Sequence, residues 1–140
     1  MLSPSHFIQQ EPKDWNNFFK TERIIQDKAI QANVDLLLAL TWRVGKENIL
    51  FVTGRKEEHR EPTANWLYEK VFYTSYFPTH TLFMRKNGDF RPDWTIKKEI
   101  YESQIKDKYN VFGVFEDRTR VVKMWRDLGL PCYQVCDGDY

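Results

Sequence analysis

The sequence predicts an α/β protein in which a parallel sheet is covered by helices on both faces. Segments with apolar residues at a 3.6-residue period alternate strictly along the chain with short, almost continuously apolar segments. Continuous apolar strands are typical of a parallel sheet buried on both sides, because each right-handed crossover returns a helix to the sheet. A length of 140 residues, of which 41% are hydrophobic, suits one domain with a single core.

The first half of the chain predicts two helix and strand pairs. Residues 27–44 have a helical apolar period, and Gly45 follows where a left-handed residue ends many helices. The apolar run Ile49–Val52 predicts a buried strand that ends in a turn at Thr53, Gly54 and Arg55. Pro62 suits the first turn of a second helix, whose inward face carries Trp66, Leu67, Lys70 and Val71. Residues 81–84 predict the second strand.

The second half repeats the alternation. Pro92 opens a predicted helix with Ile96, Ile100 and Ile105 facing inward, and Val111–Phe115 predicts the third strand. A last helix over residues 121–128 ends at Gly129, and Cys132–Cys136 predicts the final strand. We therefore expect one domain over residues 1–140, with a core at 24–140. Residues 1–23 fit no such unit and suggest an aromatic-anchored loop or a short cap.

Residues that suit phosphate binding follow the first predicted strand. In parallel sheets, ligands bind at the carboxyl ends of the strands. The Thr53 hydroxyl and the turn amides around Gly54 could donate to phosphoryl oxygens, and Arg55 could grip two oxygens at once. The same triplet also suits an ordinary turn with a surface arginine, and the residues alone leave both readings open.

Two carboxylates, Glu116 and Asp117, follow the third predicted strand. Magnesium prefers such oxygen ligands, with water completing its shell. They would equally well stabilise the positive N-terminus of the next helix, with Thr119 assisting. The sequence leaves these two interpretations evenly balanced.

Asp93 and Lys97 lie four residues apart at the start of the helix opened by Pro92, so they share one face and can pair. Most such pairs are solvated. Their position at the rim of the predicted sheet favours a second interpretation, in which a lysine held by an aspartate neutralises phosphate charge during transfer. Arg91, in the charged loop just before this helix, is a candidate for contact with a polyanionic substrate.

Composition excludes several classes of protein. With 21 basic and 20 acidic residues, the chain has no charge excess that would hold nucleic acid by phosphate contacts alone. The longest apolar stretch is far below the roughly 20 residues needed to span a membrane, and no secretion signal is visible, so we expect a cytoplasmic setting. Cys132 and Cys136 lie about 13 Å apart in a strand and are expected to be free thiols. No G-x-x-x-x-G-K-[ST] motif indicates a kinase.

The strings FVTGR, RPDWTIKKEI and VFGVFEDRTRVVKMWRDLGLPCYQVCDGDY resemble the haloacid dehalogenase (HAD) superfamily, and specifically the 3′-phosphatase domain of phage polynucleotide kinases. The resemblance runs from about Leu36 to Tyr140 and is strongest from Met84 onward. It implies a three-layer, Rossmann-like HAD sandwich and a phosphomonoester hydrolase that depends on magnesium (Mg2+) and acts on polynucleotide 3′-phosphate ends.

The same resemblance implies a role for each candidate residue. Thr53 would bind phosphate with Gly54, and Arg55 would clamp the substrate phosphate. Lys97 would be the catalytic lysine, supported by Asp93. The remaining roles are those of Asp117 as the magnesium ligand, Glu116 as a less certain second ligand, and Arg91 as a substrate contact.

The sequence departs from the family at its beginning. The family starts with a strand ending in D-x-D-G-T, whose first aspartate attacks phosphorus and whose second acts as general acid and base. No such motif precedes Ser3, Asp14 follows no strand pattern, and Asp137 lies in a string with which the family itself ends. We therefore expect the sequence as given to be catalytically incomplete and to lack the first, central strand of the sheet.

Two functions remain open on these grounds. The first is a HAD-type phosphatase whose nucleophile lies on a segment upstream of Met1. The second is a noncatalytic module that binds phosphate or nucleic-acid ends and has lost the nucleophile. In either case a second copy of the chain or a partner chain could fill the place of the missing strand, because unpaired buried strand edges are costly.

Overall fold

The computed structural model describes residues 31–72, 81–136 and 138. Several sequence predictions lie outside these residues: the cap or loop at 1–23, the first turn of the helix at 27–30, Asp14 and Asp137. The Val71 side chain, expected to face inward, is also outside the described part.

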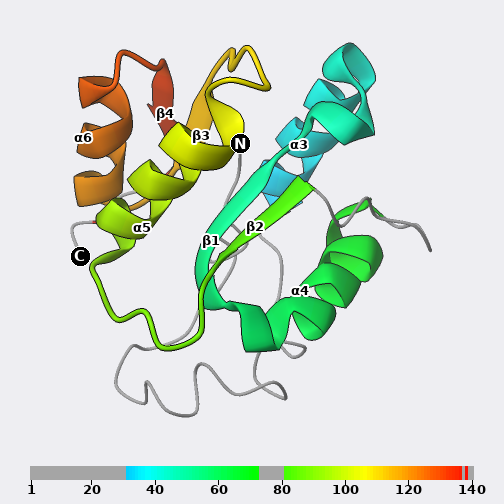
Figure 1. Ribbon diagram of the computed structural model, residues 1–140. Helices are drawn as coiled ribbons and strands as arrows, with labels where there is room; N and C mark the ends of the chain where they lie inside the picture. Colours follow the sequence, from blue (N-terminus) through cyan, green and yellow to red (C-terminus); the bar gives the residue numbers. More distant parts are fainter. Residues whose placement is uncertain (1–30, 73–80, 137, 139–140) are drawn as a thin grey trace.

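Helices and strands alternate in the predicted order along the described chain (Figure 1). The helices are α3 (Gln31–Val44), α4 (Arg60–Trp66), α5 (Asp93–Ile100) and α6 (Thr119–Asp127). Helix α4 continues as a π-helix over Leu67–Phe72, and α5 continues as one over Tyr101–Ile105. The strands are β1 (Phe51–Lys56), β2 (Leu82–Arg85), β3 (Val114–Glu116) and β4 (Cys132–Gln134). Short 3-10 turns occupy Lys46–Asn48 and Glu57–His59.

Both predicted glycine helix stops are confirmed. Gly45 has a φ of 89°, and its N–H donates to the Thr41 carbonyl at 2.9 Å. Gly129 has a φ of 86°, and its N–H donates to the Arg126 carbonyl at 2.9 Å. Only glycine adopts such a positive φ without a steric cost, so the two residues fix where α3 and α6 end.

The strands pair in parallel, as predicted, but the described strands form two sheets instead of one. β1 pairs with β2, and β3 pairs with β4. β3 is also shorter than predicted, because residues 111–113 lie outside it. Its ladder begins where the Val114 N–H donates to the Pro131 carbonyl at 2.9 Å, and Pro131 has no N–H to extend the pairing.

The predicted turn at residues 53–55 was wrong, because these residues lie inside β1. Thr53 pairs with Met84 and Lys56 with Arg85, so the register of the ladder shifts at Gly54 and Arg55, between those two rungs. A bulge of this kind bends a strand and re-aims its side chains without ending the pairing. The carboxyl end of β1 is therefore a bulged strand that continues past the polar residues.

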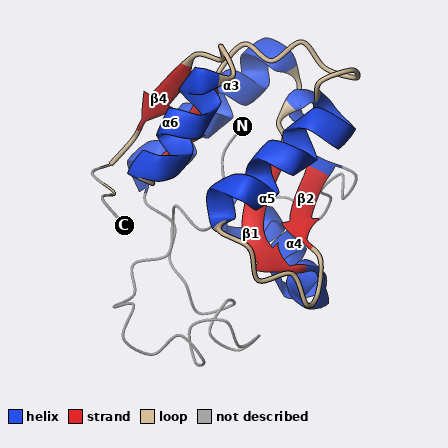
Figure 2. Ribbon diagram, turned by 60° about the vertical axis from the view of Figure 1, so that its left-hand side comes forward, coloured by secondary structure: helices blue, strands red, loops and turns tan. Residues whose placement is uncertain are grey.

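The core explains why the strand sequences are almost continuously apolar. Phe51 packs with α3 and α4 in one cluster, whereas its neighbours Leu50 and Val52 pack with Ile96 and Ile100 of α5 in another. Helices therefore cover both faces of the β1–β2 sheet, as Figure 2 shows for α5 on one side and α4 on the other. A third cluster joins β3 and β4 to α6.

Cys132 and Cys136 are both free thiols, as predicted. In the described part of the chain, no helix is long and apolar enough to cross a membrane.

Candidate phosphate-binding site

The bulged end of β1 places three predicted site residues together. The Thr53 side chain is fully buried, and Arg55 is only 3% exposed. The Arg55 N–H donates to the Thr53 hydroxyl oxygen at 3.2 Å, so the hydroxyl is held by the strand itself. The interpretation of this triplet as an ordinary turn with a surface arginine is excluded, because Arg55 is buried.

Lys97 lies at the centre of the site, with no exposed surface. Its Nζ is 2.9 Å from Glu116 Oε1 and 3.3 Å from Asp93 Oδ2. The i, i+4 pairing of Asp93 and Lys97 predicted from the sequence is therefore present, and it is buried. A charged lysine tolerates such a place only where carboxylates replace the lost water.

These charges shift the pKa values of both partners in opposite directions. Burial by itself would raise the pKa of Asp93, but nearby Lys97, Arg118 and Arg85 outweigh it and lower that pKa below its usual range. Burial by itself would lower the pKa of Lys97, but Asp93 and Glu116 outweigh it and raise that pKa. Lys97 is therefore a fixed cation and Asp93 a fixed anion at neutral pH.

The two carboxylate oxygens of Glu116 accept hydrogen bonds from different groups, Lys97 and the backbone. While Oε1 accepts from Lys97, Oε2 accepts the Asp117 N–H at 3.2 Å. Residue Arg118 is the N-cap of α6 and makes no side-chain capping hydrogen bond in the described structure. Glu116 therefore supports the lysine directly, and the interpretation in which it stabilises the start of α6 stays a prediction.

Asp117 is held by its backbone. Asp117 is only 6% exposed, and its backbone carbonyl accepts a hydrogen bond from Gln134 Nε2 at 2.9 Å. On the other side, the Thr119 N–H at the start of α6 donates to the Gly138 carbonyl at 2.8 Å. A side chain at Gly138 would collide with the Asp117 backbone, so the chain at 138 packs directly against this loop.

Two arginines contact Asp93, and neither contact was predicted from the sequence. Arg118 Nη1 lies 3.2 Å from Asp93 Oδ2, and Arg85 Nη2 lies 3.8 Å from Asp93 Oδ1. Arg85 Nε also donates to the Gly54 carbonyl at 2.8 Å, which ties the bulge of β1 to α5. Arg85 is the last residue of β2, and Arg118 lies two residues beyond β3. This position at the carboxyl end of a strand is the signal that could have indicated the two contacts.

Gly54 is required by the close approach of α5. A Cβ atom at this position would overlap with Asp93 Oδ1 and come within 3.5 Å of Arg85 Nη2. The absence of a side chain therefore lets the Thr53–Arg55 segment and the Asp93–Lys97 pair share one site.

Arg91 lies at the rim. Its guanidinium is 2.8 Å from Asp89 Oδ2 and 2.7 Å from Glu99 Oε2, and its side chain is about half exposed at 49%. Its carbonyl accepts from Arg85 Nη1 at 2.6 Å. The structure thus anchors the Arg91 backbone to the site, while two carboxylates hold its side chain. The predicted substrate contact stays a prediction.

The predicted magnesium ligands, Asp117 and Glu116, differ in how well they suit an ion. Within the part of the chain that the structure describes, no three His, Cys, Asp or Glu side chains cluster as metal ligands. Magnesium is commonly held by one or two carboxylates, with water and substrate phosphate as the other ligands. Asp117 fits that role at the end of β3, whereas Glu116 has both oxygens in contact with Lys97 and the backbone.

The fold and this site define a class of α/β protein that concentrates cationic and carboxylate groups at the carboxyl ends of parallel strands. Residues 11–140 match the polynucleotide kinase PNKP phosphatase domain family, within the HAD superfamily. The chain therefore belongs to that family, as the sequence resemblance predicted.

Curated and solved relatives agree with this assignment. The chain is 35% identical over 117 residues to an Autographa californica nuclear polyhedrosis virus protein to which a bifunctional polynucleotide kinase/RNA ligase activity is ascribed. That alignment covers 81% of this chain and 16% of the viral protein. The chain thus spans about one sixth of the curated relative's length.

Two solved structures are also similar. A chain in the structure of the Pnkp1/Rnl/Hen1 RNA repair complex superposes with a TM-score of 0.74 at 33% identity, over 87% of this chain and 37% of that one. A second Pnkp1/Rnl/Hen1 complex gives a TM-score of 0.71 at 35% identity, over 83% of this chain and 38% of the other.

Proposed function

We propose that this chain forms the phosphate-binding part of a magnesium-dependent HAD-type phosphomonoester hydrolase that acts on polynucleotide 3′-phosphate ends. The observation that carries the proposal is Lys97, a buried cation held by Asp93 and Glu116 beside the Thr53–Arg55 segment. Membership in the polynucleotide kinase phosphatase family supports the substrate class.

Each residue has a role that follows from its place. The Thr53 hydroxyl and the Gly54 backbone bind phosphoryl oxygens, and Arg55 pairs with them by charge-assisted hydrogen bonds. Lys97 stabilises the negative charge that develops on the transferred phosphoryl group, because a fixed cation in a site without water needs no reorganisation. Asp93 and Glu116 keep Lys97 charged and in position.

Magnesium is held by Asp117 in this proposal, with substrate phosphate and water as further ligands. When bound, the ion neutralises phosphate charge and orients the substrate. Glu116 lies next to it and acts mainly by positioning Lys97. Arg91 contacts the polynucleotide at the rim.

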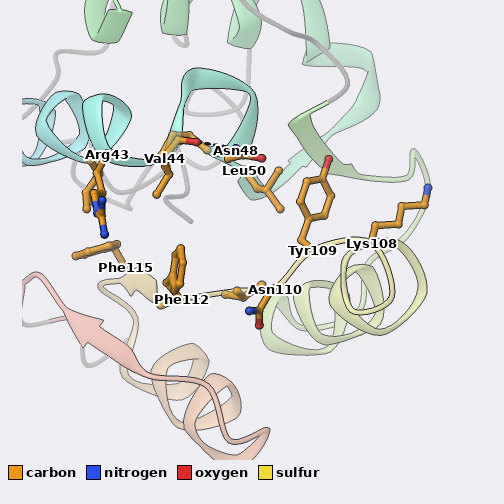
Figure 3. A pocket seen from close by; sticks show the side chains of 13 residues that line it. Arg43, Val44, Asn48, Leu50, Lys108, Tyr109, Asn110, Phe112 and Phe115 are labelled. Atoms are coloured by element: carbon orange, nitrogen blue, oxygen red, sulfur yellow. Dashed lines mark hydrogen bonds between the residues drawn. The ribbon is translucent and has the colours of Figure 1, made fainter.

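The nucleophile is proposed to lie on a further strand between β1 and β3. β1 and β3 do not pair with each other among the described strands, and a cavity of about 440 Å3 lies between the segments that lead into them. Leu50, Phe112 and Phe115 line it, as Figure 3 shows. A parallel strand there would satisfy two strand edges and would end beside Thr53 and Asp117.

We propose that polypeptide upstream of Met1 supplies this strand and ends it in D-x-D-G-T. The first aspartate would attack phosphorus, and the second would transfer the proton to and from the leaving oxygen. With this strand the domain would be the three-layer HAD sandwich. A second copy or a partner chain is the competing source of the strand.

The test measures phosphate release from a 3′-phosphorylated oligonucleotide by the chain alone and by the chain extended with such a strand. We expect Mg2+-dependent turnover only in the extended protein, with EDTA and Lys97→Met each abolishing it. A folded extended protein without turnover would refute the phosphatase. Turnover by the chain alone would instead show that the nucleophile lies within this sequence, and a rise with the square of the chain concentration would show that a second copy contributes it.

A noncatalytic end-binding module is the second candidate, because the groups that would bind phosphate are complete without a nucleophile. It predicts that the chain alone binds a 3′-phosphorylated oligonucleotide more tightly than its 3′-hydroxyl counterpart, and that Arg55→Ala removes the difference. If the extended protein binds in this way without turnover, the module is the better description.

A further inference from the structure

A second groove of the described surface lies between α5 and α6, with a volume of about 350 Å3. Trp94 and Lys98 line it from α5, and Arg120, Lys123 and Asp127 line it from α6. None of these residues belongs to the phosphate-binding site described above.

The groove begins where that site ends. Trp94 directly follows Asp93 in the first turn of α5, and Arg120 lies two residues after Arg118 in the first turn of α6. Arg118 and Asp93 are themselves joined across the two helices, with Nη1 3.2 Å from Oδ2. Lys98 and Lys123 lie about one turn further along their helices. The groove therefore leads from the site along α5 and α6, away from the strand ends.

The charge of the groove is positive. Three cations face a single carboxylate, Asp127, which pairs with Lys123 at 2.6 Å. Both partners of this pair are well exposed, at 75% and 64%, so solvent screens it and either side chain can turn to another ligand. A surplus of two positive charges remains along the groove.

Trp94 adds a flat apolar surface at the entrance. Its side chain is 41% exposed, although it belongs to the first turn of a packed helix. Aromatic side chains beside cations are the feature on which unpaired bases stack while their phosphates follow the positive charge. A base inside a duplex does not offer its face in this way.

We propose that the α5–α6 groove binds the nucleotides next to the terminal phosphate of a single-stranded polynucleotide. One base stacks on Trp94, and the following phosphates lie against Lys98 and Arg120. This inference rests on the proposed function, because the terminal phosphate at Arg55 and Lys97 sets the direction in which the strand leaves the site.

The test compares two fluorescent 3′-phosphorylated oligonucleotides, one with normal bases and one abasic at the two nucleotides nearest the phosphate. Titrating the whole chain, we expect Trp94→Ala to weaken binding of the normal probe by about fivefold or more. It should leave binding of the abasic probe unchanged. Trp94→Phe should restore most of the affinity, because it retains an aromatic face.

The cations are tested by salt dependence. Removal of one phosphate contact by Lys98→Ala or Arg120→Ala should lower the slope of log affinity against log salt by about 0.7 for a single strand. Trp42→Ala is the matched control, because Trp42 is 93% exposed on α3 and lies outside the groove. It should match the wild type on both probes.

The outcomes separate this inference from the proposed function. Wild-type binding that does not distinguish 3′-phosphate from 3′-hydroxyl ends would contradict the proposed function itself. A retained preference for the phosphate, with Trp94→Ala and Arg120→Ala indistinguishable from the wild type, would overturn only the groove. Circular dichroism establishes folding of each variant, and if Trp94→Ala is unfolded, the salt slopes of Lys98→Ala and Arg120→Ala decide.

Discussion

At the scale of single residues, the buried charge of Lys97 depends on two carboxylates. A lysine with no exposed surface has given up its hydration, and the 2.9 and 3.3 Å contacts to Glu116 and Asp93 replace it. Removing one partner of such an arrangement leaves the other charges buried without compensation, which is more costly than never having buried them. Stability and the proposed phosphate chemistry therefore depend on the same side chain.

We expect Lys97→Met to lower the free energy of unfolding by about 3–5 kcal/mol, because it takes a buried cation away from Glu116 and from Asp93, which then keeps only the contacts with Arg85 and Arg118 described above. Urea denaturation followed by circular dichroism measures the change. Lys106→Met, at an exposed lysine just beyond the same helical segment, is the control and should change stability by less than about 0.5 kcal/mol. Equal effects of the two substitutions would contradict the buried-charge argument.

Asp93 should make stability depend on acid pH. Its pKa in the folded state is lowered, so its contribution is complete above the ordinary value of 3.8 and is lost as pH falls through the lower folded value. Asp93→Asn should therefore lose less stability than the wild type as pH falls from about 5 to about 2.5, a fall that begins above the ordinary pKa of 3.8 and runs toward the lower folded value.

The same experiment with Asp107→Asn provides the control, because Asp107 is exposed and outside the site. It should keep the wild-type acid dependence.

The raised pKa of Lys97 has the opposite effect on stability. The contribution of Lys97 to stability is complete below pH 10.5 and is lost as pH rises through the higher folded pKa. No loss from either group is expected at neutral pH.

How far the sequence could predict the site differs from residue to residue. Asp93 and Lys97 could be paired because a helical spacing of four fixes their proximity. Glu116 could not be assigned to Lys97, since 19 residues separate them and only the packing of α5 beside β3 brings them together. From the sequence alone, stabilisation of the next helix and metal binding were equally good interpretations of Glu116.

At the scale of elements, the bulge in β1 determines how close α5 can approach. Gly54 does not have a positive φ, so its backbone conformation would suit other residues. A side chain is excluded at this position because the Asp93 carboxylate occupies the space. We expect Gly54→Ala to displace the Asp93 carboxylate and to lower stability by about 1–3 kcal/mol, as overpacking does.

Two measurements check the Gly54 prediction. Urea denaturation gives its cost, and the acid dependence of stability should become shallower because Asp93 leaves its cations. Gly88→Ala is the comparison: Gly88 has a φ of 80° but open space around its Cβ position. That substitution should cost about 1–2 kcal/mol from backbone strain, without changing the acid dependence.

Two thiols lie in and just after the short strand β4, and they differ in exposure. Cys132 is 8% exposed, and burial raises its pKa to about 11, whereas Cys136 just beyond the strand is exposed. The thiolate is the reactive form of cysteine. We therefore expect a disulfide reagent at pH 8 to modify Cys136 quickly and Cys132 only on unfolding. In Cys136→Ser the fast reaction should disappear; its persistence would show that β4 opens readily.

The elements were predictable in kind and less so in length. The ends of α3 and α6 could be located because glycine marks them through its backbone conformation. The length of a strand depends instead on its partner: β1 extends through polar residues because β2 pairs as far as Arg85, and β3 is short because Pro131 limits its ladder. Neither partner is visible in the local sequence pattern.

At the scale of the whole molecule, Tyr101 connects the two described sheets. It packs against the cluster of β3, β4 and α6 and also against the cluster between β1 and α5. Its ring meets Trp125 edge to face, with centroids 5.9 Å apart. By contrast, among the three core clusters of the described residues, Tyr68 packs against the one formed by α3, α4 and the β1–β2 sheet.

We expect Tyr101→Ala to loosen the β3–β4 sheet more than Tyr68→Ala does. Each should destabilise the fold by about 2 kcal/mol or more, since both remove a half-buried aromatic ring. At urea concentrations that equalise global stability, Cys132 should be modified faster in Tyr101→Ala. Equal rates would indicate that both halves open as one unit.

The overall arrangement could be predicted only in part. Alternation, parallel pairing and burial on both faces all follow from local patterns, and they are confirmed for the β1–β2 sheet. The division of the described strands into two sheets does not follow from these patterns, because a periodicity shows which face is buried and not which strand lies beside which. The cavity between β1 and β3 is a property of that arrangement.

The contact between Gly138 and the loop after β3 bears on how the protein can be handled. Fusion partners and affinity tags are usually attached to a chain's terminal region on the assumption that it is inert. Here the Gly138 carbonyl accepts the first amide of α6, and its backbone fits against Asp117 with no room for a side chain. Shortening the chain before Gly138, or replacing that glycine with a linker residue, would therefore alter the loop that carries Asp117.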